Sequence, residues 1–176
     1  MAEQNQALWA PWRMEYILAN TAAPEGSACF LCDYVAHPEL DAQHHVIWRT
    51  PQSLTLFNSF PYNNGHLMVA PLQHAARLED LADNVLLAMM HHTRDAQRLL
   101  DETVSAQGYN IGLNFGRCAG AGLPGHLHIH IVPRWSGDTN FMAVIGDTRV
   151  IPESLAALHA RMREAAPRLG LPALVE

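Results

Sequence analysis

His126-Leu127-His128-Ile129-His130-Ile131-Val132 is the stretch that decides the fold of this chain. Side chains alternate between the two faces of a β-strand, so a strand over 126–132 places the three histidines on one face and Leu127, Ile129 and Ile131 on the other. The aliphatic face is typical of a strand that packs on a core. The histidine face indicates a functional surface, because packing alone needs no imidazole. A metal site and a partly exposed sheet face are the plainer alternatives.

Strand-like and helix-like runs surround this stretch. Apolar runs bounded by turn residues predict strands over 46–48, 54–57, 66–70 and 110–115. A 3.6-residue apolar period predicts a long helix from about Arg77 to Val104, and Pro152 is expected to open a second helix through about Arg163. The predicted fold class is α+β, a mostly antiparallel sheet with one long helix and a C-terminal helix. We expect an N-terminal arm and linker over 1–28, a core domain over 29–145 and a helical extension over 146–176.

Composition limits the partners and the chemistry. The 176 residues carry a net charge of -6, which argues against a nucleic-acid or anionic-membrane partner. No apolar run is long enough to span a membrane, and the N-terminus lacks the pattern of a signal peptide, so we expect a cytoplasmic protein. All 11 basic residues are arginine, which excludes a P-loop lysine, a Schiff base and a nucleotide carried on lysine. Arginine, histidine or backbone N–H groups must therefore hold any bound phosphate.

Two motifs together carry a family resemblance. The histidine stretch resembles the signature of the histidine triad (HIT) family, in which three histidines alternate with apolar residues. Asn58-Ser59-Phe60-Pro61-Tyr62-Asn63-Asn64-Gly65-His66 and the following residues through His74 resemble the second motif of that family. Flanking residues 8–13 and 133–141 are similar to the bacterial branch that includes diadenosine tetraphosphate phosphorylases. The resemblance covers roughly residues 29–135.

The resemblance implies a nucleotidyl-histidine mechanism. His128, the middle histidine, would attack the α-phosphorus of a nucleotide, and His130 would bind or protonate the phosphate bridge. Imidazole suits this work because its neutral form is a nucleophile near neutral pH. The implied nucleotide and phosphate contacts are Asn58 at the ribose, Asn114 at the phosphate or leaving group, His66 in support of the triad, and the backbone of Gly120 and Gly122. Gly122 stands where the family often has glutamine, and backbone, Arg117 or Arg134 would replace that contact.

The cysteine pair Cys29-x2-Cys32 has the spacing of zinc ligands, although the pair alone fits two buried thiols equally well. The resemblance favours zinc, because some family members bind a structural zinc ion with such a pair. Their other two ligands correspond to His74 and His126. The zinc would be structural, since four protein ligands leave no open position for water.

The expected activity is cleavage of dinucleoside polyphosphates, with phosphate as the acceptor in a diadenosine tetraphosphate phosphorylase. The alternatives are a dinucleoside polyphosphate hydrolase or nucleoside phosphoramidase that uses water, and a non-catalytic nucleotide-binding regulatory module. The resemblance also implies a homodimer. Neither the base preference nor the length of the polyphosphate follows from the sequence.

Overall fold

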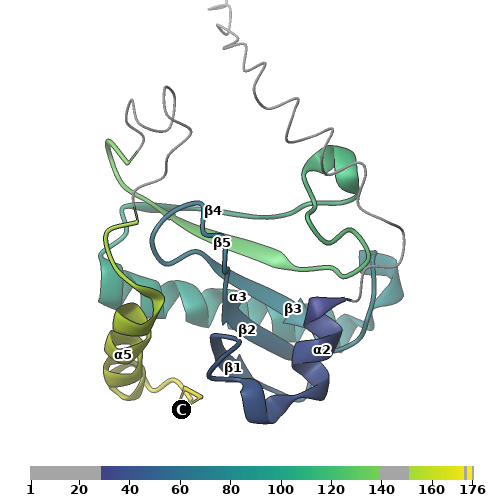
Figure 1. The fold of residues 1–176 in the computed structure, drawn as a ribbon, viewed down its shortest axis with the longest axis horizontal. Helices are drawn as coiled ribbons and strands as arrows, with labels where there is room; N and C mark the ends of the chain where they lie inside the picture. The colour runs from purple at the N-terminus through teal and green to yellow at the C-terminus, as the bar shows by residue number, and fades with distance from the viewer. Residues whose placement is uncertain (1–28, 139–150, 173, 176) are drawn as a thin grey trace, which may run out of the picture.

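The computed structural model describes residues 29–138, 151–172 and 174–175, and its centre is a five-stranded antiparallel sheet (Figure 1). The strands are β1 (Val46–Arg49), β2 (Ser53–Phe57), β3 (Leu67–Pro71), β4 (Gly108–Leu113) and β5 (Ile129–Arg134). Their order is β1-β2-β3-β5-β4, so the histidine-bearing strand β5 lies between β3 and the edge strand β4. The predicted N-terminal arm over 1–28 lies outside the described residues.

The first three strands form a meander. The β1–β2 turn closes where the Thr50 N–H donates to the Ser53 carbonyl at 3.0 Å. β2 then pairs with β3 along its whole length, from Ser53 opposite Pro71 to Phe57 opposite Leu67. This pairing leaves β3 free on its other side for β5, which arrives only after the long helix and β4. The predicted antiparallel sheet is therefore confirmed.

Helices and short 3-10 turns cover the sheet. The helices are α2 (Phe30–Ala36), α3 (Asp83–Val104) and α5 (Leu155–Ala165). The 3-10 turns are η1 (Pro38–Leu40), η2 (Leu78–Asp80), η3 (Arg117–Ala119) and η4 (Ala166–Leu169). None of the described helices is long and apolar enough to cross a membrane.

The two faces of the sheet carry separate cores. Against α3 and α5, the main core buries Leu127, Ile129 and Ile131 from the histidine stretch, as the alternation predicts. A smaller core lies under α2 on the opposite face (Figure 1) and includes Leu31, Leu56 and Met68. This second face is also the one on which the histidines lie, because they alternate with the buried aliphatic residues.

Three predicted boundaries are wrong by three residues or more, for local reasons. β5 begins at Ile129 rather than at His126, because its ladder with β3 covers only Ile129–Ile131 and the Leu127 N–H donates instead to Ala75 at 2.7 Å. The long helix begins at Asp83 rather than near Arg77, since Leu81 and Ala82 are extended. α5 begins after Ser154, whose hydroxyl accepts from the Ala157 N–H at 3.2 Å, and not at Pro152.

Helix α2 was not predicted. Cys29 precedes this helix, and its Sγ accepts from the Cys32 N–H at 3.4 Å, as an N-cap side chain does. The short helix thereby turns the two cysteines of the pair toward one another.

Candidate functional site

Four side chains from distant parts of the chain form a possible metal site. Cys29 and Cys32 come from the start of α2, His74 from the segment after β3, and His126 from the residues before β5. One ligand atom from each lies within 4.8 Å of all the others. These are the four residues that the family resemblance implied as zinc ligands.

The distances between the ligand atoms suit a tetrahedrally coordinated ion. Cys29 Sγ lies 3.2 Å and Cys32 Sγ 3.6 Å from His126 Nδ1, and Cys32 Sγ lies 3.1 Å from His74 Nδ1. Zinc bond lengths of about 2.0–2.3 Å in a tetrahedron imply ligand separations of about 3.5 Å. His126 Nε2 lies 2.9 Å from the Pro71 carbonyl, so Nε2 carries the proton and Nδ1 keeps the lone pair that a metal needs.

The charges at this cluster also suit a cation. Burial lowers the pKa of His126, which keeps its imidazole neutral. Burial, and then the neighbouring Cys29, raise the pKa of the Cys32 thiol, so a second thiolate is costly here without a positive charge. The donor set and its electrostatics therefore match a Cys2His2 zinc site.

His128 lies next along the stretch and is held in one tautomer. Its Nδ1 lies 2.9 Å from the His126 carbonyl. A carbonyl only accepts, so Nδ1 donates and Nε2 carries the lone pair. Burial lowers the pKa of His128 below its ordinary value, so the ring stays neutral at pH 7. The geometry gives a neutral imidazole with a nucleophilic nitrogen.

His130 belongs to a chain of hydrogen bonds that begins at a backbone amide. The Tyr62 N–H donates to His66 Nδ1 at 3.0 Å, and His66 Nε2 lies 3.0 Å from His130 Nδ1. Because His66 accepts at Nδ1, its proton is on Nε2 and is donated to His130, whose own proton is therefore on Nε2. Burial, and then His128, lower the pKa of His130 to about 4. The His130 imidazole is therefore neutral at pH 7.

The predicted nucleotide contacts fall at two places around this pair. Asn58 lies beside His66, with its Nδ2 3.4 Å from Nδ1 of that ring and its Oδ1 accepting from the Phe60 N–H at 2.9 Å. Asn114 directly follows β4, whose last pair joins Leu113 to Ile129, so the same register places it opposite His128, the residue before β5. It also lies next to Gly120, because a Cβ built there would be 4.0 Å from its Nδ2.

The glycine loop supplies fewer donors than its composition indicates. The Gly120 N–H donates to the Arg117 carbonyl at 2.9 Å, and Gly120 itself has a left-handed φ of 86° that favours glycine. Gly122 donates to no backbone carbonyl among the described residues. Arg134 pairs with Asp138 at 2.6 Å and also donates to Asn110. Arg117, the other arginine proposed to replace the family glutamine, is the first residue of η3 in this loop.

Sequence reasoning missed Tyr62. Its ring centroid lies 4.6 Å from that of His66 and 5.9 Å from that of His130, and the latter pair is stacked. The signal was present in the second motif, four residues before His66, but a tyrosine in a turn has no distinguishing chemistry until the turn is folded.

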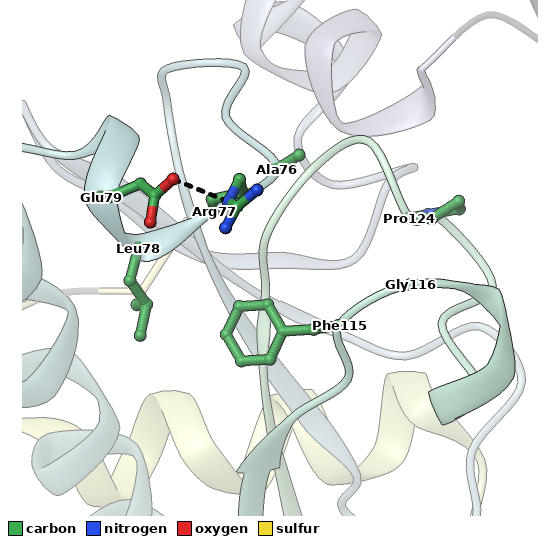
Figure 2. A pocket seen from close by; sticks show the side chains of 7 residues that line it. All are labelled: Ala76, Arg77, Leu78, Glu79, Phe115, Gly116 and Pro124. Atoms are coloured by element: carbon green, nitrogen blue, oxygen red, sulfur yellow. Dashed lines mark ion pairs between the residues drawn. The ribbon is translucent and has the colours of Figure 1, made fainter.

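An open hollow of about 550 Å³ is lined by residues 76–79, by Phe115 beside Asn114, and by Gly116 and Pro124 of the glycine loop. Figure 2 shows the Phe115 ring and Leu78 across from one another in this hollow, with the Arg77–Glu79 ion pair at its wall.

Comparisons with known proteins agree with the geometry. The family model described as HIT domain matches residues 39–137. A protein named AP-4-A phosphorylase from Mycobacterium tuberculosis is 40% identical over 156 residues, which cover 87% of this chain and 80% of that protein. An asymmetrical bis(5'-nucleosyl)-tetraphosphatase from Schizosaccharomyces pombe is 36% identical over 93 residues, covering 53% of this chain and 50% of that protein.

A solved structure points to the same family. A Zn-bound histidine triad family protein from Mycobacterium smegmatis has a TM-score of 0.66 and 27% identity, covering 81% of this chain and 96% of that chain. With the triad, the second motif and the four possible metal ligands in place, this chain belongs to the HIT domain family, the histidine triad family.

Proposed function

We propose that this chain is a nucleotidyl-transfer enzyme that cleaves dinucleoside polyphosphates, as a diadenosine tetraphosphate phosphorylase. The observation that carries the proposal is the bond between His128 Nδ1 and the His126 carbonyl, which gives Nε2 the lone pair needed for attack on phosphorus. The M. tuberculosis relative, named AP-4-A phosphorylase, supports the choice of substrate and acceptor.

The proposed reaction has two displacements at one phosphorus atom. His128 Nε2 forms a bond to the α-phosphorus, while the bond from that phosphorus to the bridging oxygen breaks and its electrons leave with the nucleotide. Inorganic phosphate then attacks the same phosphorus and releases His128. Donors placed around the transferring group supply the remaining stabilisation, and His130 Nε2–H, Asn114 and the Gly122 amide are the proposed donors. Asn58 is proposed at the ribose, where its side chain would exchange the local Phe60 contact for a substrate hydroxyl.

A structural zinc ion is part of the proposal, held by Cys29, Cys32, His74 and His126. Its contribution is a cross-link between α2, the segment after β3 and the residues before β5. His126 has a double role here, because the carbonyl that orients His128 belongs to the same residue that would bind zinc. The Zn-bound M. smegmatis structure supports the identity of the metal.

A homodimer is also proposed, with a second copy of this chain at the β4 edge. Among the described strands β4 pairs with β5 alone, so it forms an edge of the sheet. Ile111 on this strand is 43% exposed, and Leu87 and Met90 on α3 are 58% and 56% exposed. Tyr109 links the two elements, since its hydroxyl donates to Asp101 on α3 at 2.7 Å. Burial of this apolar surface against an identical copy would provide the driving force.

The test of the activity is product analysis with diadenosine tetraphosphate, in the presence and absence of phosphate. ADP and ATP formed only with phosphate support the phosphorylase, whereas AMP and ATP in plain buffer indicate the hydrolase. His128→Asn is expected to lower turnover by about 10³-fold or more while substrate still binds. His91→Asn, at an exposed position on α3, is the matched control and is expected to retain activity. Wild-type turnover in His128→Asn, or no turnover of any nucleotide by the wild type, refutes the proposal.

A further inference from the structure

Tyr62 stands at the beginning of the hydrogen-bond chain that ends at His130. It lies in the turn between β2 and β3, and it contacts the histidine pair in two ways. Its backbone N–H donates to His66 Nδ1 at 3.0 Å, and its ring packs on both imidazoles, with centroid distances of 4.6 and 5.9 Å. The two imidazoles are themselves joined at 3.0 Å.

We infer that Tyr62 is a positioning residue that holds His130 as a fixed hydrogen-bond donor toward the substrate. The inference rests on the proposed function, in which His130 faces the transferring phosphate. The direction of the chain follows from its first member. A backbone N–H can only donate, so His66 must accept at Nδ1, donate at Nε2 and leave His130 with its proton on Nε2.

The Tyr62 amide also prevents proton transfer along this chain of hydrogen bonds, because an amide does not give its proton to an imidazole. If His130 gave its Nε2 proton to a leaving group, it would need a replacement from His66 through Nδ1. His66 would then have to take a proton from the Tyr62 amide, which keeps its own. His130 therefore contributes a fixed donor rather than a relayed proton, which suits a leaving group that departs as a phosphate anion and needs no protonation.

The ring supplies the restraint that keeps this amide in place. His66 is fully buried, whereas Tyr62 is 48% exposed, so the turn that carries the amide has a solvent-facing side. The tyrosine ring covers the buried imidazole and stacks on His130, at an interplanar angle of 26°. Such contacts hold both the turn and the His130 plane, and removing the ring frees both.

The neighbouring Phe60 offers a matched control. It lies two residues earlier in the same turn and is 85% exposed. Its backbone N–H, not its ring, donates to Asn58 Oδ1. Truncation of Phe60 thus removes an aromatic side chain from the turn and leaves the contacts of the Tyr62 ring with His66 and His130 in place.

The test combines imidazole ¹⁵N NMR with kinetics on the full-length protein. The wild type is expected to carry the proton on Nε2 in both His66 and His130. Tyr62→Ala is expected to give a mixed tautomer at His130 and to lower kcat by about 10- to 100-fold, with a smaller change in KM. Phe60→Ala is expected to match the wild type, and Tyr62→Phe, which keeps the ring, is expected to recover most of the kcat and the His130 tautomer that Tyr62→Ala loses.

Several results would overturn the inference. One is an Nδ1 proton on His130 in the wild type, which needs no variant to be folded. Another is a Tyr62→Ala protein with the wild-type tautomer and kcat, and a third is a Tyr62→Phe protein as impaired as Tyr62→Ala. The proposed function fails separately, if the wild type turns over no dinucleoside polyphosphate, because the NMR measurement uses the protein without substrate.

Discussion

Replacing Arg49 with methionine tests how the last residue of β1 supports α2, the helix whose start carries Cys29 and Cys32 of the possible metal site. The Arg49 guanidinium donates to both carboxylate oxygens of Asp41, at 2.9 and 2.6 Å. The same group donates to the carbonyls of Tyr34 at 2.7 Å and Val35 at 3.3 Å, near the end of α2. One side chain therefore neutralises a buried carboxylate and satisfies two helix carbonyls that have no intrahelical partner.

The size of the loss follows from burial. The Asp41 side chain is 6% exposed and that of Arg49 is 23% exposed. Removing one partner of a buried ion pair costs about 3–5 kcal/mol, because the other charge is left without a partner. Water reaches part of the Arg49 site and methionine keeps the apolar stem, so we expect a loss of about 2–4 kcal/mol in the free energy of unfolding.

Urea unfolding followed by tryptophan fluorescence, at fixed protein and zinc concentrations, measures this loss. Arg77→Met is the control, because Arg77 and Glu79 are each 69% exposed and their pair is worth at most about 1 kcal/mol. Adding Asp41→Asn to Arg49→Met should recover part of the stability, since no unpaired charge then remains. An Arg49→Met protein no less stable than Arg77→Met would refute the reasoning.

Three further predictions concern the metal, pH and assembly. Cys32→Ser is expected to lose the bound zinc, about one equivalent per chain in the wild type by metal analysis, whereas Cys118→Ser, at an exposed loop position, keeps it. Stability should fall as pH drops from about 6.5 toward 4. Over this range the histidine is protonated in the unfolded chain, whereas buried His130 stays neutral in the folded protein down to its pKa of about 4. His130→Asn should flatten this slope, and an unchanged pH profile would contradict the assignment. Ile111→Arg should shift the protein from dimer to monomer in analytical ultracentrifugation, and a wild-type monomer would exclude the proposed interface.

Local sequence patterns were sufficient for most of the secondary structure. The long helix was predicted from its 3.6-residue apolar period, and the five strands were predicted from short apolar runs between turn residues and from the histidine alternation. The boundaries were less accurate, since they depend on single contacts, such as the Leu127 amide bonding to Ala75 instead of to a strand partner. Helix α2 escaped prediction because its seven residues are too few for a periodic signal and its N-cap is a cysteine.

The candidate site was likewise predicted only in part from the sequence. The histidine alternation and the second motif were sufficient to nominate the triad residues and Asn58, and residue chemistry with the resemblance nominated the four metal ligands. The role of Tyr62 did not follow from the sequence, because it arises from a turn amide placed against a ring. Gly120 was nominated as an amide donor, but its N–H is already bonded within the loop.

By itself, the sequence determined which residues can do chemistry here and which face of the stretch 126–132 the three histidines share, because alternation is a local property of an extended chain. Only the tertiary structure decided what each histidine does. His126 meets a cysteine 97 residues away, and His130 meets a histidine 64 residues away, so their partners are set by how the sheet is assembled. Tautomers follow from those partners, since an imidazole nitrogen donates or accepts according to the group it faces.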